Sequence, residues 1–251
     1  MSVSIKSNRE IELMREAGKV LGELHERLKE LVVPGVSTYE IDMKCREMIK
    51  GYGCEPNFLD YQGYPSSVCV SVNEEVVHGI PKKDRFLNEG DIVSLDTGVI
   101  YKGYHSDAAR TWPVGQVDEE AIRLMEVTRE AFFEGIRYAV DGGHLFDIGK
   151  AIQMYVEKNG FSVVRDLVGH GIGTHLHEAP EIPNFKPIGR GIRIQKGMTF
   201  AIEPMVNEGL YGVENTGDGW TFVTCDGKRS AHYENTILIT DGEPEILSLN
   251  I

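Results

Sequence analysis

Asp91-Ile-Val-Ser-Leu-Asp96 has a counterpart 107 residues further along the chain, Met198-Thr-Phe-Ala-Ile-Glu203. Each stretch is apolar enough to predict a buried strand, and each ends on a carboxylate. A glycine precedes both, Gly90 in the first case and Gly197 in the second. A single match of this kind would mean little, so other features at the same offset decide whether the chain repeats itself.

Helical features share the offset. Ser7 with Glu10 forms a capping-box pattern that predicts a helix, which Pro34-Gly35 ends. A second box, Ser37 with Glu40, predicts a shorter helix that ends near Gly51. Its apolar face consists of Ile41, Cys45, Met48 and Ile49, and this face returns 107 residues later as Ile148, Ile152, Tyr155 and Val156.

Two further glycines, Gly35 and Gly53, return at the same offset as Gly142 and Gly160. We therefore expect two related α+β halves, residues 1–110 and 111–251, packed about a pseudo-two-fold axis. No linker rich in Pro, Gly or Ser separates them, so we expect a single catalytic domain over residues 1–251. Further strands are expected over 67–77, 91–101, 198–206 and 233–240, with a hairpin at Asp226-Gly227 between 220–225 and 228–234.

The composition excludes several classes of protein. With 41% hydrophobic and 26% charged residues, the 251-residue chain has the profile of a soluble globular protein. No apolar run approaches the roughly 20 residues of a membrane helix, and the first ten residues lack the apolar core of a signal peptide, so we expect no export. The net charge of −13 argues against a nucleic acid or an anionic membrane as partner. The cysteines, at 45, 54, 69 and 225, have no paired spacing and are expected as free thiols.

Asp96 and Asp107 fall on the two strands of an expected hairpin that turns near Tyr101–Gly103. A turn centred between Tyr101 and Lys102 places the two carboxylates directly opposite each other, and a turn one residue later makes them diagonal neighbours. In both cases they share a face.

The second half offers Glu203 on one strand and Glu234 on a returning strand. Four carboxylates in one partly buried place repel one another, and two divalent cations would cancel their charge. Carboxylate oxygens also bridge pairs of metal ions readily.

A histidine flanked by glycines joins this set. His170 lies in Gly169-His-Gly-Ile-Gly173, where glycines permit a close backbone approach or a positive φ that would hold an imidazole at a metal. The tract is neither a zincin helix nor a dinucleotide-binding fingerprint, and no phosphate-binding loop occurs elsewhere. His78 ends an expected strand. The remaining histidines, at 25, 105, 144, 175 and 232, are expected at the surface or as satisfied interior residues.

The order and spacing of Asp96, Asp107, His170, Glu203 and Glu234 resemble those of the five metal ligands of type I methionine aminopeptidases, which have the α+β pita-bread fold, an antiparallel sheet covered by helices. Surrounding words resemble the same family along nearly the whole chain: Tyr64-Pro-Ser-Ser-Val-Cys69, Val77-His-Gly-Ile-Pro81, His170-Gly-Ile-Gly173, Ile202-Glu-Pro204 and Ser230-Ala-His-Tyr-Glu234.

The resemblance implies a dinuclear metallo-exopeptidase that removes the initiator methionine and prefers a small second residue. Asp107 and Glu234 would bridge two ions, with Asp96 on one and His170 and Glu203 on the other. Glu203 would also shuttle protons. His177 would stabilise the tetrahedral intermediate, and His78 would contact the peptide. The methionine pocket would consist of Phe58, Tyr61, Tyr64, Cys69, Leu176 and Trp220, whose aromatic and sulfur groups suit a thioether.

Two residues depart from the pattern of several relatives, Phe58 in place of cysteine and Leu176 in place of phenylalanine, and they put the shape of the pocket in doubt. The resemblance implies two divalent ions (Co, Mn, Fe or Zn) and a monovalent cation near Asn73 and Ser230. The expected partners are the N-termini of nascent chains, with transient ribosome association, no nucleic-acid substrate and no membrane. We expect a cytoplasmic monomer. Two alternatives stay open: an X-Pro aminopeptidase or prolidase, and a non-catalytic pita-bread module that binds peptides.

Overall fold

The computed structural model describes residues 3–249, so the first two residues of the leading segment lie outside the described residues. Four long helices are present: α1 (Asn8–Lys29), α2 (Thr38–Gly51), α3 (Glu119–Ile136) and α4 (Leu145–Lys158). Both predicted capping boxes are confirmed, because Ser7 and Ser37 accept the backbone N–H of Glu10 and Glu40 while these glutamates accept the N–H of each cap. Such boxes satisfy N–H groups that the first helical turn leaves unpaired.

The strands form antiparallel sheets. In the first half, β4 (Ile92–Tyr101) pairs with β5 (Tyr104–Pro113) on one side and with β1 (Glu55–Pro56) and β2 (Cys69–Val72) on the other. In the second half the order is β15 (Glu245–Ile246), β14 (Asn235–Leu238), β9 (Thr199–Ile202), β7 (Gly169–Gly171) and β8 (Glu178–Ile182).

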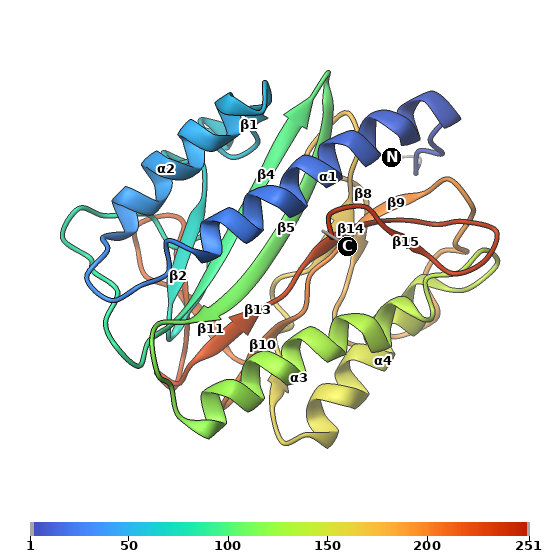
Figure 1. Cartoon of the computed structure of the whole chain (residues 1–251). Coiled ribbons are helices and arrows are strands. Elements are labelled where there is room, and N and C mark those ends of the chain that lie inside the picture. The colour runs from blue at the N-terminus through green and yellow to red at the C-terminus, as the bar shows by residue number, and fades with distance from the viewer. Residues whose placement is uncertain (1–2, 250–251) are drawn as a thin grey trace.

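Two three-stranded sheets connect these parts. One has the order β13 (Ser230–His232), β10 (Met205–Asn207) and β6 (Ser162–Val163), and the other has the order β11 (Val213–Asn215), β12 (Phe222–Thr224) and β3 (Glu75–Val77). A short 3₁₀ helix, η1, spans Tyr61–Gly63. Strands from the two ends of the chain therefore lie side by side at the centre of the molecule (Figure 1).

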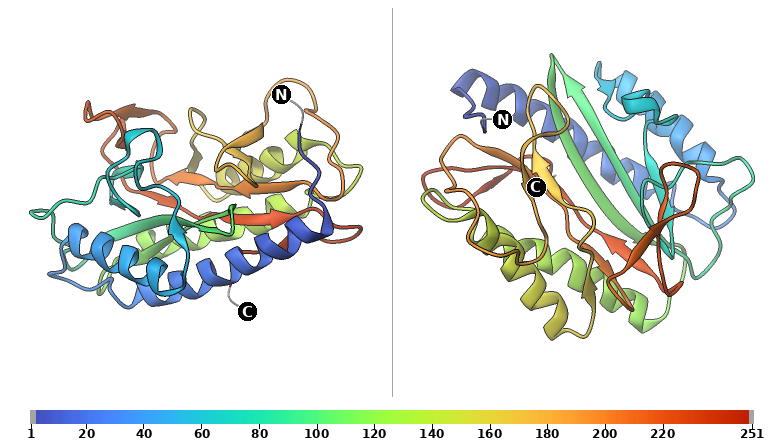
Figure 2. Two further views of the ribbon diagram at one scale, coloured as in Figure 1. Left: turned by 90° about the horizontal axis from the view of Figure 1, so that it is seen from above. Right: turned by 180° about the vertical axis from the view of Figure 1, so that it is seen from behind.

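The helices cover one side of the sheets. Helices α1 and α2 lie against the β4–β5 pair, and α3 and α4 pack on each other beside the strands of the second half (Figure 1). Seen from above, α1 and α2 lie on one side of the strands while long loops rise on the other (Figure 2). Each half buries its own apolar cluster, around Leu21, Ile41 and Leu95 in the first and around Phe132, Ile148 and Phe200 in the second. Burial of this kind supplies the main driving force for folding.

Features of the structure recur at the offset of 107 residues. Helices α2 and α4 have bounds that differ by this number, and the N–H of Gly35 bonds to the carbonyl of Leu87 as that of Gly142 bonds to Ile194, at 2.7 and 2.9 Å. Both glycines have a positive φ, of 90° and 80°, which a side chain would disfavour. We propose that the chain is one domain built from two related halves.

The hairpin predicted at Asp226-Gly227 is wrong. A turn exists there, but β12 pairs with β11 and β3, whereas β13 pairs with β10. The Asp226 carboxylate accepts the N–H of Leu210 at 2.7 Å and ties the turn to another loop. The predicted strands 67–77 and 198–206 are each divided in two, the first by a turn at Asn73, whose φ of 56° departs from extended backbone.

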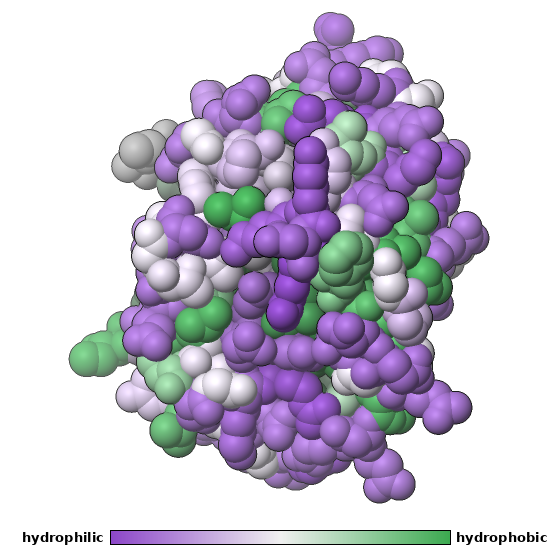
Figure 3. All heavy atoms as spheres, turned by 90° about the vertical axis from the view of Figure 1, so that its left-hand side faces the viewer, coloured by the Kyte–Doolittle hydropathy of each residue, from purple (hydrophilic) through white to green (hydrophobic). Residues whose placement is uncertain are grey.

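The exterior is largely hydrophilic on the face drawn in Figure 3, where apolar side chains form only scattered patches. This agrees with the net charge of −13. None of the helices within residues 3–249 is long and apolar enough to cross a membrane.

Candidate active site

The carboxylates of the first half converge on one face of the β4–β5 pair. Asp96 lies opposite Ala109, and Asp107 lies opposite Gly98, so the turn falls at Lys102 and Gly103. Of the two registers that the sequence allowed, the diagonal one is therefore present. Side chains two residues apart on a strand share a face, which places Asp96 and Asp107 on the same side of the sheet.

The carboxylates of the second half are brought to the same place by pairing between strands. Glu203 follows the last residue of β9 and Glu234 precedes the first residue of β14, and these two strands pair along their length. The N–H of Glu234 also donates to the carbonyl of Ala109 at 3.0 Å, the residue opposite Asp96. The two halves thus meet at the level of the four carboxylates.

His170 extends from β7, which lies between β8 and β9. Its Nδ1 lies 2.9 Å from the carbonyl oxygen of Gly171, so Nε2 is left to face Oε1 of Glu203 at 3.6 Å. A Cβ on Gly169 would overlap the carbonyl oxygen of Ala201, and one on Gly171 would overlap that of Ala179. The flanking glycines therefore serve close strand packing, and neither has a positive φ.

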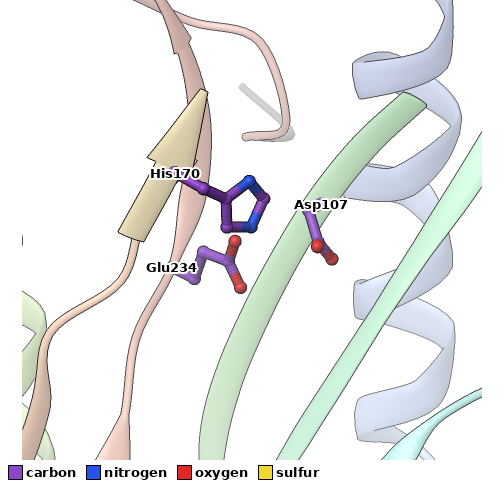
Figure 4. A group of neighbouring side chains, drawn as sticks. All are labelled: Asp107, His170 and Glu234. Carbon is purple, nitrogen blue, oxygen red and sulfur yellow. The ribbon is translucent and has the colours of Figure 1, made fainter. Parts of the chain in front are cut away.

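Asp107, His170 and Glu234 point toward one another (Figure 4), and their potential ligand atoms all lie within 4.8 Å of each other. Asp96 and Glu203 line the same cavity. Oδ1 of Asp96 and Oε1 of Glu234 are buried without a hydrogen-bond partner among the described residues. Unpaired buried carboxylate oxygens are expensive unless a cation binds them, so this donor set fits divalent metal ions.

The electrostatics of the cluster point the same way. Burial raises the pKa of Asp107 to about 7, and burial together with neighbouring carboxylates raises the pKa values of Asp96, Glu203 and Glu234 well above their usual range. The pKa of His170 is lowered to about 3, mainly by burial. Its imidazole is therefore neutral at physiological pH, which is the form that coordinates a metal.

A cavity of about 240 Å³ opens onto this cluster. It is lined by all the residues that the resemblance implied for the methionine pocket: Phe58, Tyr61, Tyr64, Cys69, Leu176 and Trp220. The ring of Tyr64 meets that of Trp220 edge to face, with centroids 5.1 Å apart, and the Tyr64 hydroxyl donates to the carbonyl of Gly79 at 2.9 Å. Leu167 and Met205 add further apolar surface that the sequence reasoning had not assigned.

The two other histidines with an implied role also line the cavity. The ring of His177 lies edge-on to that of His170, with centroids 4.3 Å apart, and its Nδ1 is 2.7 Å from the hydroxyl of Tyr61. His78 has a φ of 59°, and its ring packs edge-on against those of Trp220 and Phe222. The positive φ of a bulky residue at the edge of a pocket is a form of strain often found at functional sites.

The sequence reasoning missed His232, which was expected to be an ordinary surface or satisfied residue. The structure contradicts that expectation: His232 is 1% exposed and lines the cavity, and neither ring nitrogen has a hydrogen-bond partner among the described residues. The signal was its position two residues before Glu234, because a strand would bring both to one face. By contrast, His25 is a satisfied interior residue, with Nε2 2.9 Å from the carbonyl oxygen of Ala108.

Comparison with known proteins gives a consistent result. The profile of metallopeptidase family M24 matches residues 12–241. A methionine aminopeptidase of Clostridium perfringens is 54% identical over 247 residues, which cover 98% of this chain and 99% of that one. The crystal structure of methionine aminopeptidase from Thermotoga maritima, 46% identical, superposes with a TM-score of 0.97 over 99% of this chain and all of that one. A prolidase from Pyrococcus furiosus shares the fold at 22% identity and a TM-score of 0.79, and the match covers 98% of this chain and 66% of that one.

Proposed function

The chain belongs to metallopeptidase family M24, and we infer that it is an aminopeptidase that removes the N-terminal methionine from polypeptides. The single observation that carries this inference is the joining of two features in one cavity. A wall of aromatic, sulfur and aliphatic side chains leads directly to a buried cluster of carboxylates and histidines. Such a wall fits the flexible thioether of methionine, and the cluster fits hydrolytic metal ions.

We propose that two divalent ions bind here, each Co²⁺, Mn²⁺, Fe²⁺ or Zn²⁺. Asp107 and Glu234 would bridge them, with Asp96 on one ion and His170 and Glu203 on the other. The formal charge supports two ions, because four carboxylates balance two divalent cations. The unpaired oxygens of Asp96 and Glu234 support it as well. When bound, the ions would lower the pKa of a water molecule and polarise the scissile carbonyl.

The side chains of the protein would handle the protons and the developing charge. Glu203, whose burial favours the protonated form, would take a proton from the attacking water and deliver it to the leaving amine. The hydroxyl of Tyr61 occupies Nδ1 of His177 and so leaves Nε2 free to donate toward the developing oxyanion. His78 would hold the peptide backbone of the substrate at the mouth of the cavity.

Specificity would come from the size of the cavity. Phe58, Tyr61 and Leu176 narrow one part of it, and Tyr64, Cys69 and Trp220 surround another. About 240 Å³ accommodates one methionine side chain with little to spare, so the residue that follows methionine should be small.

Further parts of the proposal concern a second cation and the cellular setting. The carbonyl of Asn73 lies beside Ser230, accepting its N–H at 2.8 Å, which places two backbone groups where a monovalent cation would bind. The substrates are peptide N-termini, and we propose that the protein is a monomer that acts on nascent chains in the cytoplasm, in transient contact with ribosomes.

The prolidase-type alternative is not favoured, because the similarity to those enzymes extends to the fold alone. The distinguishing experiment is to incubate the purified protein with Mn²⁺ or Co²⁺ and either Met-Ala-Ser or the dipeptide Leu-Pro. We expect methionine release from the tripeptide and no cleavage of the dipeptide. The Glu203→Gln variant is the matched control, because it keeps the shape of the site and removes the proton acceptor. Cleavage of Leu-Pro in preference to Met-Ala-Ser would overturn the assignment.

A further inference from the structure

His232 occupies an unusual position beneath the carboxylates. Its Nε2 lies 3.9 Å from Oε2 of Glu203 and 4.0 Å from Oε2 of Glu234. The residue is 1% exposed, and both ring nitrogens lack a hydrogen-bond partner among the described residues. A buried imidazole normally has at least one partner, so this one is aimed at a group that it has yet to engage.

Glu203 lies between two imidazoles. Its Oε1 faces Nε2 of His170 at 3.6 Å, whereas its Oε2 faces Nε2 of His232 at 3.9 Å. The two oxygens of one carboxylate are thus distinguished by their surroundings, one toward the other metal-binding groups and one toward the base of the cavity.

The backbone of His232 is fixed, so the glutamate is the group that can adjust. The N–H of His232 donates to Oγ1 of Thr111 at 2.8 Å, and that hydroxyl donates back to the carbonyl of His232 at 2.9 Å. On the other side, His232 pairs with Met205 across β13 and β10. A small rotation of the Glu203 side chain would close 3.9 Å to hydrogen-bond distance, and active-site hydrogen bonds are often long before the site is loaded.

We propose that His232 is a positioning residue whose Nε2–H holds Oε2 of Glu203, so that Oε1 is presented beside His170 and Oε2 is kept for proton transfer. This inference rests on the role proposed above for Glu203. Direct coordination of a metal by His232 fits less well. Among the described residues, only Asp107, His170 and Glu234 place their ligand atoms within 4.8 Å of one another.

Three substitutions test the proposal. His232→Gln places an amide N–H where Nε2 now lies, His232→Asn reaches only as far as Nδ1, and His232→Leu has no donor. We expect the Leu and Asn variants to lose about 10- to 100-fold in kcat and in Mn²⁺ affinity measured by calorimetry, with KM changed less than about twofold. The Gln variant should recover most of both quantities.

The absorption spectrum of the Co²⁺-loaded protein separates positioning from coordination. Under the proposal the Gln variant keeps the ligand-field bands of the wild type, because no ligand has been lost. A change of those bands in the Gln variant would show that His232 coordinates the metal and would overturn the proposal. Wild-type affinity and kcat in the Leu variant would overturn it equally.

Thermal melting of the chelated variants verifies that each one folds. Failure of the proposed function would appear differently, as absence of methionine release by the wild type, whereas the calorimetric ranking of the variants needs no turnover.

Discussion

The ammonium group of Lys6 lies 2.6 Å from Oε2 of Glu178, although the two residues are 172 positions apart. Glu178 directly follows His177, and its Oε1 also accepts the N–H of His175 at 3.2 Å. Lys6 is itself fixed, because its N–H donates to the carbonyl of Gly197 at 2.8 Å. The segment before α1 therefore holds the loop that carries His177.

This ion pair should matter for both stability and rate. Lys6→Met leaves a largely buried carboxylate without its partner, and we expect a loss on the order of 3 kcal/mol in the free energy of unfolding. We also expect a lower kcat, because His177 loses its fixed position. Urea denaturation and steady-state kinetics measure the two effects. In a double-mutant cycle with Glu178→Gln the effects should be less than additive, and strict additivity would mean that the pair has no coupling.

His177 itself should affect turnover more than binding. His177→Ala removes the donor proposed for the oxyanion, and we expect kcat on Met-Ala-Ser to fall by roughly 10²-fold or more with KM little changed. Tyr61→Phe should give a smaller loss in the same direction, because it removes only the partner of Nδ1. An increase confined to KM in His177→Ala would assign this residue to substrate binding instead.

Metal content should depend strongly on Glu234. As a bridging ligand it would contact both ions, so Glu234→Ala should lose both, whereas Asp96→Ala should retain one ion more readily. Elemental analysis of protein dialysed against Mn²⁺ or Co²⁺ gives the stoichiometry. One tightly held ion in the Glu234→Ala variant would contradict the bridging role.

Metal binding should release protons near neutral pH. In the metal-free protein the raised pKa values of the carboxyl groups, about 7 for Asp107, mean that the cluster holds protons at pH 6. A divalent ion binds the deprotonated form, so its apparent affinity should rise from pH 6 to pH 8. His170, with its pKa lowered to about 3, contributes no proton in that range. Calorimetry in two buffers of different ionisation enthalpy counts the protons, and Asp107→Asn should release fewer. Heats independent of the buffer would refute this account.

The packing around β7 gives a prediction about stability. Gly169→Ala would push a methyl group into the carbonyl oxygen of Ala201 on the neighbouring strand. We expect a loss of about 1–3 kcal/mol in the free energy of unfolding, as for other overpacked sites, and weaker Mn²⁺ binding because His170 moves with the strand. Gly217→Ala is a suitable comparison of another kind, since that loop glycine has open space around it and only its φ of 90° to strain. It should leave metal affinity unchanged.

Much of this arrangement could be predicted from the sequence because it depends on local patterns. The capping boxes at Ser7 and Ser37 determine where two helices begin, and alternation along β4 and β5 determines that Asp96 and Asp107 share a face. The fold class and the activity followed from a resemblance carried by motifs spread along the chain.

The features that escaped prediction depend on contacts between distant segments. The Asp226-Gly227 turn resembles a hairpin locally, but its two strands join different sheets, because β13 has a partner in β10 and β12 has partners in β11 and β3. The setting of His232 depends on the approach of Glu203 from another sheet, which no spacing within 230–234 reveals. The attachment of Lys6 to Glu178 joins residues near opposite ends of the catalytic machinery and leaves no local pattern.

The bond between Glu234 and Ala109 has a consequence for how the protein is made. The walls of the cavity extend in sequence from Phe58 to Glu234, so a ribosome must translate nearly the entire message before the cavity can close. Until then the emerging polypeptide has donors without their counterparts and no enclosed chamber. An enzyme that trims newly synthesised proteins is thus inert throughout its own synthesis, and its first methionine must await either its completed self or an older copy.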